Sequence, residues 1–319
     1  MNRISFKWMV ASVLSVAMLL SVQQAKANVD TTIFFLSPLE GKWDITVDEE
    51  GEQKPSWLEV RHSGLKTLVG YFVGTGGSVR PISRVNFANN KMDFTIPPQW
   101  DEGQDMVFEA TFANDKLTGT VVRADGKKFN WTGVRAPELI RTKEPAWGAP
   151  VKLFNGKDLT GWHAKGENQW IVKDGILASP RPGSNLISDE KFNDFKLHIE
   201  FRYPEKSNSG VYLRGRYEVQ IEDSKGKPAL VDYFGAVYGF IAPIENVAKA
   251  AGEWQSYDIT LIGRLVTVVA NGKMIICNQV IPGITGGALD SNEGEPGPIY
   301  FQGDHDRIEY RNIVITPAK

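Results

Sequence analysis

Short runs of alternating apolar and polar residues recur along most of the chain. An alternation with a period of two places apolar side chains on one face of a β-strand and polar side chains on the other. Turn-forming pairs separate the runs, and Asp125-Gly126, Asp174-Gly175 and Asn271-Gly272 are strong hairpin signals. Only residues 244–251 carry a helical pattern, of two turns at most. The pattern therefore predicts an all-β protein of barrel or sandwich type.

A proline-rich segment divides these strands into two groups. Glu144-Pro-Ala-Trp-Gly-Ala-Pro150 contains a glycine and two prolines, and proline stiffens a linker and cannot continue a β-ladder. We predict an N-terminal antiparallel β-domain over residues 28–143, a linker over 144–150 and an antiparallel jelly-roll sandwich over 151–319. Gly41-Lys-Trp43 at the start of the first domain favours a lipocalin-like barrel, with a sandwich as the alternative.

The first 27 residues have the pattern of a secretory signal peptide. Arg3 and Lys7 precede an apolar run over residues 9–22, which is short for a membrane span. Ala25-Lys-Ala27 then places small residues at the two positions that signal peptidase requires. We expect an exported protein, periplasmic or secreted, without a membrane anchor after cleavage.

Charge and cysteine content limit the classes of partner. The whole chain has 36 Lys and Arg against 38 Asp and Glu, and removal of three cations with residues 1–27 leaves 33 against 38. A mildly acidic chain with mixed charges has no electrostatic attraction to nucleic acid or anionic lipid. The single cysteine, Cys277, cannot form an internal disulfide, and its apolar run Met274-Ile-Ile-Cys277 predicts a core position.

The run from Val211 to Glu222 has the most distinctive polar pattern. If it is one strand, one face carries Val211, Leu213, Gly215, Tyr217, Val219 and Ile221. The other face carries Tyr212, Arg214, Arg216, Glu218, Gln220 and Glu222. Planar Arg, Gln and Glu groups pair well with sugar hydroxyls, so this face predicts a concave sugar-binding surface, to which Asn208 in the preceding turn also contributes. The alternative is a solvated face held by cross-strand ion pairs.

Glu218 and Glu222 also resemble the outer carboxylates of the Glu-x-Asp-x-Glu strand in laminarinase-type retaining glycosidases. Gln220 stands here in place of the central acid and carries no charge that would tune its neighbours. Retaining chemistry needs carboxyl groups about 5–5.5 Å apart. The Cα atoms of residues four apart on a strand are separated by ~13 Å, so the two side chains would have to lean together.

Longer motifs of the second domain resemble the 3-keto-disaccharide hydrolase family. They are Leu153-Phe-Asn-Gly-Lys-Asp-Leu-Thr-Gly-Trp162, Asn208-Ser-Gly-Val-Tyr-Leu-Arg-Gly-Arg-Tyr-Glu-Val-Gln-Ile221, Gly235-Ala-Val-Tyr-Gly239, Ala251-Gly-Glu-Trp254, Ile299-Tyr-Phe-Gln-Gly-Asp-His305 and Glu309-Tyr-Arg-Asn-Ile313. The resemblance spans nearly all of residues 151–317. It departs from the family at Asp306, where glycine is common.

This resemblance implies a concanavalin-like jelly roll that acts on glycosides oxidised to a ketone at carbon 3. The ketone acidifies the hydrogen on carbon 2, so a base can remove it, the group on carbon 1 can leave, and water can add to the product. On this basis Glu218 or Glu222 is the expected base, and His305 is the expected acid or second base. The expected substrate-binding residues are Arg214, Arg216, Gln220, Gln302, Asn208 and Tyr238, with the two arginines also able to stabilise an enolate.

Three functions remain open from the sequence: a 3-keto-glycoside hydrolase or lyase, an ordinary retaining glycosidase, and a carbohydrate-binding protein without catalysis. The expected partner is a small carbohydrate. The sequence requires no cofactor, but Asp290, Glu293 and Asp304 are candidate ligands of a divalent cation, without the spacing of an EF-hand. It does not determine the oligomeric state.

Overall fold

The computed structural model describes residues 37–319, which form 21 β-strands and no helix. The all-β prediction is confirmed, whereas the short helix predicted at residues 244–251 is wrong: this segment is irregular. Within residues 37–319, no helix is long and apolar enough to cross a membrane. The predicted signal peptide lies outside the described residues.

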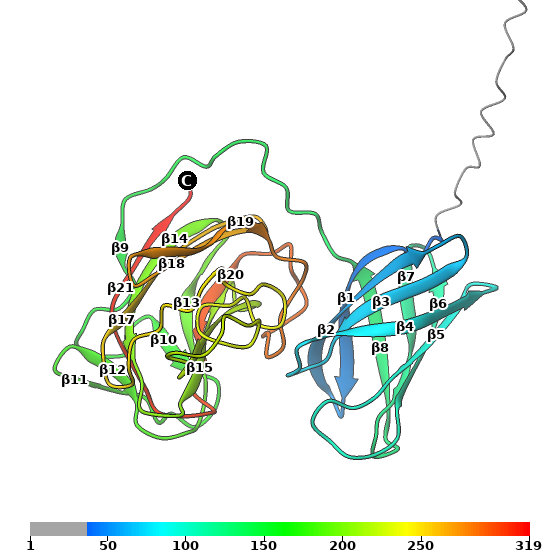
Figure 1. The fold of residues 1–319 in the computed structure, drawn as a ribbon, viewed down its shortest axis with the longest axis horizontal. Coiled ribbons are helices and arrows are strands. Elements are labelled where there is room, and N and C mark those ends of the chain that lie inside the picture. Colours follow the sequence, from blue (N-terminus) through cyan, green and yellow to red (C-terminus); the bar gives the residue numbers. More distant parts are fainter. Residues whose placement is uncertain (1–36) are drawn as a thin grey trace, which may run out of the picture. The chain divides into compact units, whose positions relative to one another are not determined.

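The first eight strands form a closed antiparallel barrel, in which each strand pairs with the next and β8 returns to β1 (Figure 1). They are β1 (Gly41–Glu49), β2 (Glu52–Ser63), β3 (Thr67–Val73), β4 (Val79–Ala88), β5 (Lys91–Ile96), β6 (Met106–Ala113), β7 (Lys116–Val122) and β8 (Lys128–Arg135). Alternate residues of these strands fill the interior, as the burial of Trp43, Ile45 and Val47 on β1 illustrates. The N-terminal region is thus a barrel and not a sandwich.

The remaining strands form the two sheets of a jelly-roll sandwich (Figure 1). The five-stranded sheet has the order β10 (Trp162–Ala164), β13 (Leu186–Phe192), β20 (Gly297–Phe301), β15 (Asn208–Leu213), β16 (Tyr217–Glu222). The second sheet has the order β11 (Ile171–Lys173), β12 (Ile176–Ser179), β21 (Ile308–Pro317), β14 (Phe195–Arg202), β17 (Gln255–Ile262), β18 (Leu265–Ala270), β19 (Lys273–Val280), and β9 (Val151–Lys152) pairs with β21. One large apolar cluster supplies the sandwich core.

Residues 37–319 belong to one compact unit, so the division into domains at residues 144–150 stays a prediction. Cys277 is exposed, contrary to the prediction of a core position. The ladder between β18 and β19 shifts register near Val268, and the neighbouring Ile275 and Ile276 are both buried. This irregularity breaks the simple alternation and leaves Cys277 on the outside.

The predicted single strand from Val211 to Glu222 is instead the hairpin of β15 and β16. Arg214 and Gly215 both have positive φ, of 52° and 67°, and the Arg216 amide donates to the Leu213 carbonyl at 3.1 Å. Two successive residues with positive φ make a tight turn whose twist suits a hairpin. The prediction of a single strand was wrong because an arginine rarely adopts the left-handed backbone conformation, and the sequence gives no sign that Arg214 does so.

Candidate active site

The β15–β16 hairpin places Glu218 directly opposite Tyr212 in the antiparallel register. Side chains of directly opposite residues lie on the same face of a sheet, so the phenol and the carboxyl meet. The Tyr212 hydroxyl lies 2.9 Å from Oε2 of Glu218. Gly210 on β15 leaves room for the acid, because a Cβ at this position would lie 2.1 Å from Oε1 of Glu218. The hairpin therefore holds Glu218 in a slot that a larger residue at 210 would fill.

Glu218 is only 3% exposed, and this burial raises its pKa to about 8. The hydrogen bond with Tyr212 and the nearby charge of His305 act in the opposite direction but are smaller. A carboxyl group with this pKa exchanges its proton near neutral pH. Such a group in a cavity is a candidate acid or base.

The Tyr212 hydroxyl is also 3.0 Å from the carbonyl oxygen of Gly286. A phenol has one proton and can donate to only one of these two oxygens at a time. When it donates to Glu218, the bond stabilises the carboxylate and lowers the pKa of Glu218, against the larger effect of burial. The Tyr212 hydroxyl therefore supports the ionised form of Glu218, which is the form that can act as a base.

A second tyrosine extends this polar surface. The rings of Tyr300 and Tyr212 stack with centroids 4.3 Å apart and planes inclined by 18°. The side-chain amide of Asn185 donates to the Tyr300 hydroxyl at 2.6 Å. The β13–β20–β15 part of the sheet brings these three residues together from distant parts of the sequence.

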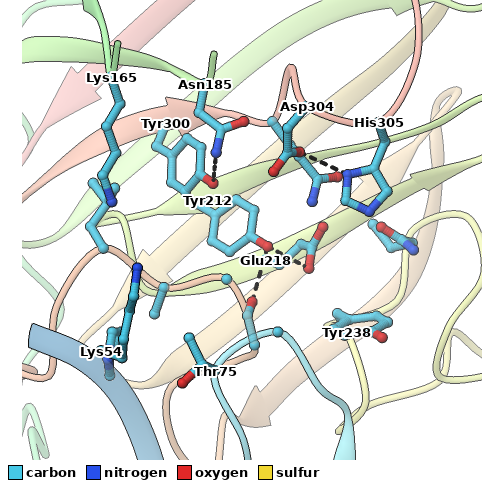
Figure 2. A pocket seen from close by; sticks show the side chains of 18 of the residues that line it. Lys54, Thr75, Lys165, Asn185, Tyr212, Glu218, Tyr238, Tyr300, Asp304 and His305 are labelled. Atoms are coloured by element: carbon cyan, nitrogen blue, oxygen red, sulfur yellow. Dashed lines mark hydrogen bonds and ion pairs between the residues drawn. The ribbon is translucent and has the colours of Figure 1, made fainter. Parts of the chain in front are cut away.

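His305 and Asp304 form an ion pair beside Glu218, with Nδ1 of the imidazole 2.7 Å from Oδ1 of the acid (Figure 2). The hydrogen bond with Asp304 is the main cause of the raised pKa of His305, and burial acts against it. Burial alone would raise the pKa of Asp304, but the hydrogen bond and charge of His305 hold it below its usual value. The pair therefore favours imidazolium and carboxylate, and supplies a positive charge next to Glu218.

Two buried amide oxygens on the same surface lack hydrogen-bond partners in the part of the chain that the structure describes. Within residues 37–319, the Oε1 atoms of Gln220 and Gln302 accept no hydrogen bond, although the two side chains are 3% and 9% exposed. Burying a polar atom without a partner is unfavourable, so both oxygens are suited to accept hydrogen bonds from a ligand. Tyr238 lies nearby, and burial raises the pKa of its phenol to about 12, which keeps it a donor.

These groups line one cavity of about 510 Å³, a volume typical of small-molecule sites (Figure 2). Its lining from the sandwich includes Lys165, Asn185, Asn208, Tyr212, Glu218, Gln220, Tyr238, Tyr300, Gln302, Asp304 and His305. Residues 52–55, Thr75 and Gly76 of the barrel region line it as well. The polar side chains and stacked rings suit a hydroxyl-rich ligand.

The cavity contains most of the residues proposed from the sequence. It brings together Asn208, Glu218, Gln220, Tyr238, Gln302, Asp304 and His305. Glu222 is half-buried at the end of β16 and does not line it. Arg214 and Arg216 do not line it either, because they lie in the hairpin turn.

The side chains of Arg214 and Arg216 form hydrogen bonds with other residues of the protein. Nη2 of Arg214 donates to the Tyr217 hydroxyl at 2.8 Å and to the Gly263 carbonyl at 3.0 Å. Nε of Arg216 donates to Asp290 at 2.7 Å. These contacts correct the expectation that either arginine reaches the substrate.

The three acids considered as metal ligands have other partners. Asp290 pairs with Arg216, Glu293 pairs with Arg264, and Asp304 pairs with His305. No cluster of three or more His, Cys, Asp or Glu able to hold a metal ion occurs in the part of the chain that the structure describes. The prediction of a cation at these residues has no support from their arrangement.

Sequence reasoning missed Lys165, Asn185, Tyr300 and the barrel residues as parts of the site. Tyr300 alternates with Gln302 in the motif Ile299-Tyr-Phe-Gln302, and this spacing could have placed both on one face. Asn185 and the barrel residues carry no comparable signal, because tertiary structure alone brings them to the cavity.

Residues 149–316 match the family described as the 3-keto-alpha-glucoside-1,2-lyase-like domain. The match covers more than half of the chain and includes every sandwich residue named above as lining the cavity. The protein therefore belongs to this family, as its motifs predicted.

A curated relative from Bacteroides thetaiotaomicron, named 3-keto-disaccharide hydrolase, is 28% identical over 166 residues. The match covers 40% of this chain and 57% of the relative, so the chain spans little more than half of that protein's length. The solved structure of a "putative glycosyl hydrolase" from Parabacteroides distasonis ATCC 8503 is 29% identical, with a TM-score of 0.46, over 57% of this chain and 96% of that one. Another structure of that description from the same organism is 25% identical, with a TM-score of 0.42, over 53% and 98%.

Proposed function

We propose that this protein cleaves the bond at carbon 1 of sugars that carry a ketone at carbon 3, by elimination followed by addition of water. Membership of the family and the name of the Bacteroides thetaiotaomicron relative support this class of substrate. The observation that carries the proposal is Glu218, a buried carboxyl with a pKa of about 8 in a polar cavity.

Glu218 acts as the base in this proposal. Its carboxylate takes the proton from carbon 2, and the electron pair of the broken C–H bond forms an enolate with the ketone at carbon 3. A carboxylate with a pKa near 8 is a stronger base than an ordinary glutamate, because the low-polarity surroundings destabilise its charge. The enolate then collapses, the bond from carbon 1 to the leaving oxygen breaks, and Glu218 returns its proton to that oxygen.

His305 stabilises the enolate oxygen. Asp304 keeps the imidazole charged, and a fixed positive charge beside developing negative charge lowers the barrier to enolate formation. Because Arg214 and Arg216 are turned into the interior, His305 is the cation next to Glu218 that can serve this purpose. Glu218 then takes a proton from a water molecule whose oxygen bonds to carbon 1 of the unsaturated sugar, and the enolate that forms takes this proton back from Glu218 at carbon 2, so that net hydrolysis results.

An ordinary retaining glycosidase has less support. It needs a second carboxylate facing the same sugar carbon, and the expected partner Glu222 does not line the cavity.

Solvent exchange at carbon 2 tests the proposed chemistry. A 3-keto glucoside is incubated with the protein in D₂O, and its proton and deuterium content is followed by NMR. Loss of the carbon-2 proton that depends on Glu218 is expected, whereas the unoxidised glucoside should keep its proton. Cleavage without loss of the carbon-2 proton would contradict an elimination.

A further inference from the structure

One wall of the cavity comes from the barrel and not from the sandwich. Glu52, Gln53, Lys54 and Pro55 on β2, with Thr75 and Gly76 in the loop between β3 and β4, line the same cavity as Glu218. These residues lie outside the matched range 149–316. The family's own motifs therefore give no role to this wall.

Close backbone contacts hold this wall against the sandwich. A Cβ on Gly286 would lie 2.3 Å from the Gly77 carbonyl oxygen, and a Cβ on Gly283 would lie 2.1 Å from Nε1 of Trp57. Trp57 of β2 is fully buried within the apolar cluster of the sandwich. The strand that carries Lys54 is thus packed into the core next to the site.

A buried charged cluster adds to this attachment. Asp44 of β1 lies beside Glu293 of the sandwich, and burial, followed by the charge of Glu293, raises the pKa of Asp44 to about 9. Arg264 pairs with Glu293 and also donates to the Pro137 carbonyl at 3.1 Å. Loss of either Arg264 or Glu293 would leave the other as a buried charge without its partner, which makes disruption of this cluster costly.

The barrel wall and the sandwich each contribute a lysine to one end of the cavity. Figure 2 shows Lys54 and Lys165 at the end opposite His305 and Tyr238, with Glu218 between the two ends. Glu52 pairs with Lys54, and the charge of Lys165 also acts on Glu52, although less strongly. Two ammonium groups and one carboxylate can together donate to and accept from several hydroxyls.

We propose that this end of the cavity, formed by Lys54 of the barrel and Lys165 of the sandwich, binds the sugar ring that leaves from carbon 1. The inference rests on the proposed function, in which carbon 2 lies at Glu218 and the ketone faces His305. The group on carbon 1 then extends away from His305, toward the two lysines. A cavity of about 510 Å³ has room for a second ring. The barrel is therefore part of substrate recognition and sets the preference for a disaccharide.

Kinetics with two substrates test this subsite. A 3-keto disaccharide carries the second ring, and a methyl 3-keto glucoside does not. Lys54→Ala and Lys165→Ala should each raise KM for the disaccharide about tenfold, the effect of losing roughly one good hydrogen bond, with kcat nearly unchanged. Both variants should act on the methyl glucoside like the unaltered protein. Lys91→Ala, on the exposed outer side of β5, is the matched control.

Equal kinetics of all variants on the disaccharide, or equal losses on both substrates, would overturn the subsite. Calorimetric binding of the two sugars to Glu218→Gln, with and without Lys54→Ala, separates this inference from the proposed function. If the unaltered protein cleaves neither sugar but the disaccharide binds through Lys54, the proposed function fails and the subsite stands. If neither sugar binds to Glu218→Gln, the subsite fails as well.

Discussion

Replacement of Glu218 by glutamine should make the protein more stable at neutral and alkaline pH. The two side chains have nearly the same shape, so Gly210 and Tyr212 keep their contacts. Glutamine carries no charge at any pH, whereas folding at neutral pH forces Glu218 to take up a proton or bury a carboxylate. The substitution removes that cost.

The size of this effect follows from the pKa of Glu218, which rises on folding from 4.5 to about 8. One pKa unit corresponds to about 1.4 kcal/mol, so burial of the acid costs about 3 kcal/mol at pH 7 and about 5 kcal/mol above pH 8. The side chain is 3% exposed, so solvent screening reduces these values little. The same amounts are the gain in stability expected for Glu218→Gln.

The direction of the pH dependence is also defined. Between pH 4.5 and 8 the unfolded chain has released this proton and the folded protein retains it, so the contribution of Glu218 to stability falls as the pH rises. Below pH 4.5 the acid is protonated in both states and the cost vanishes. The stability difference between the two proteins should therefore be small at pH 4 and grow up to pH 8.

Urea unfolding at several pH values measures this difference. Glu109→Gln, on the exposed outer side of β6, is the matched control and should follow the unaltered protein. Parallel stability curves for Glu218→Gln and the unaltered protein from pH 4 to 8.5 would refute the reasoning, as would a less stable variant at pH 8.

Three further predictions concern the surroundings of Glu218 and the buried charged cluster. Tyr212→Phe removes a hydrogen bond that lowers the pKa of Glu218, so the acidic limb of the kcat/KM profile should move to higher pH; an unmoved limb would contradict the assignment. Gly210→Ala places a methyl group against Oε1 of Glu218 and should lower stability by about 1–3 kcal/mol, measured in urea, and reduce turnover; a fully active variant would show that the slot is not needed. Arg264→Met leaves Glu293 buried without its cation and should destabilise by about 3–5 kcal/mol, part of which Glu293→Gln in the same chain should restore; no loss in the single variant would show that the pair is not structural.

The sequence predicted the local features of the fold well. Hairpin turns such as Asp125-Gly126 and Asn271-Gly272 have conformations that short-range chemistry determines, and both connect adjacent strands as expected. The alternation around Glu218 also placed Tyr212 and Gln220 on its face correctly. The placement of Tyr212 was correct even though the prediction of a single strand was wrong, because Tyr212 and Glu218 lie opposite each other in the β15–β16 hairpin and so share a face.

The prediction errors arise at residues whose conformation or position depends on tertiary contacts. Arg214 adopts a left-handed conformation that its residue type disfavours, and the turn carries it into contact with Gly263. Nothing in the alternation distinguishes an arginine aimed at a substrate from one that donates to an interior carbonyl. Likewise, Asn185 and Lys54 reach the site only through the pairing of strands and the packing of the barrel.

The most direct test of the account compares the unaltered protein and Glu218→Gln on a disaccharide and on its 3-keto form. We predict that the unaltered protein cleaves only the oxidised sugar, and that Glu218→Gln, while folded, loses about 10²–10⁴-fold in rate, the usual contribution of a well-placed general base. Cleavage of the unoxidised disaccharide, or unchanged turnover of the 3-keto disaccharide by Glu218→Gln, would contradict it.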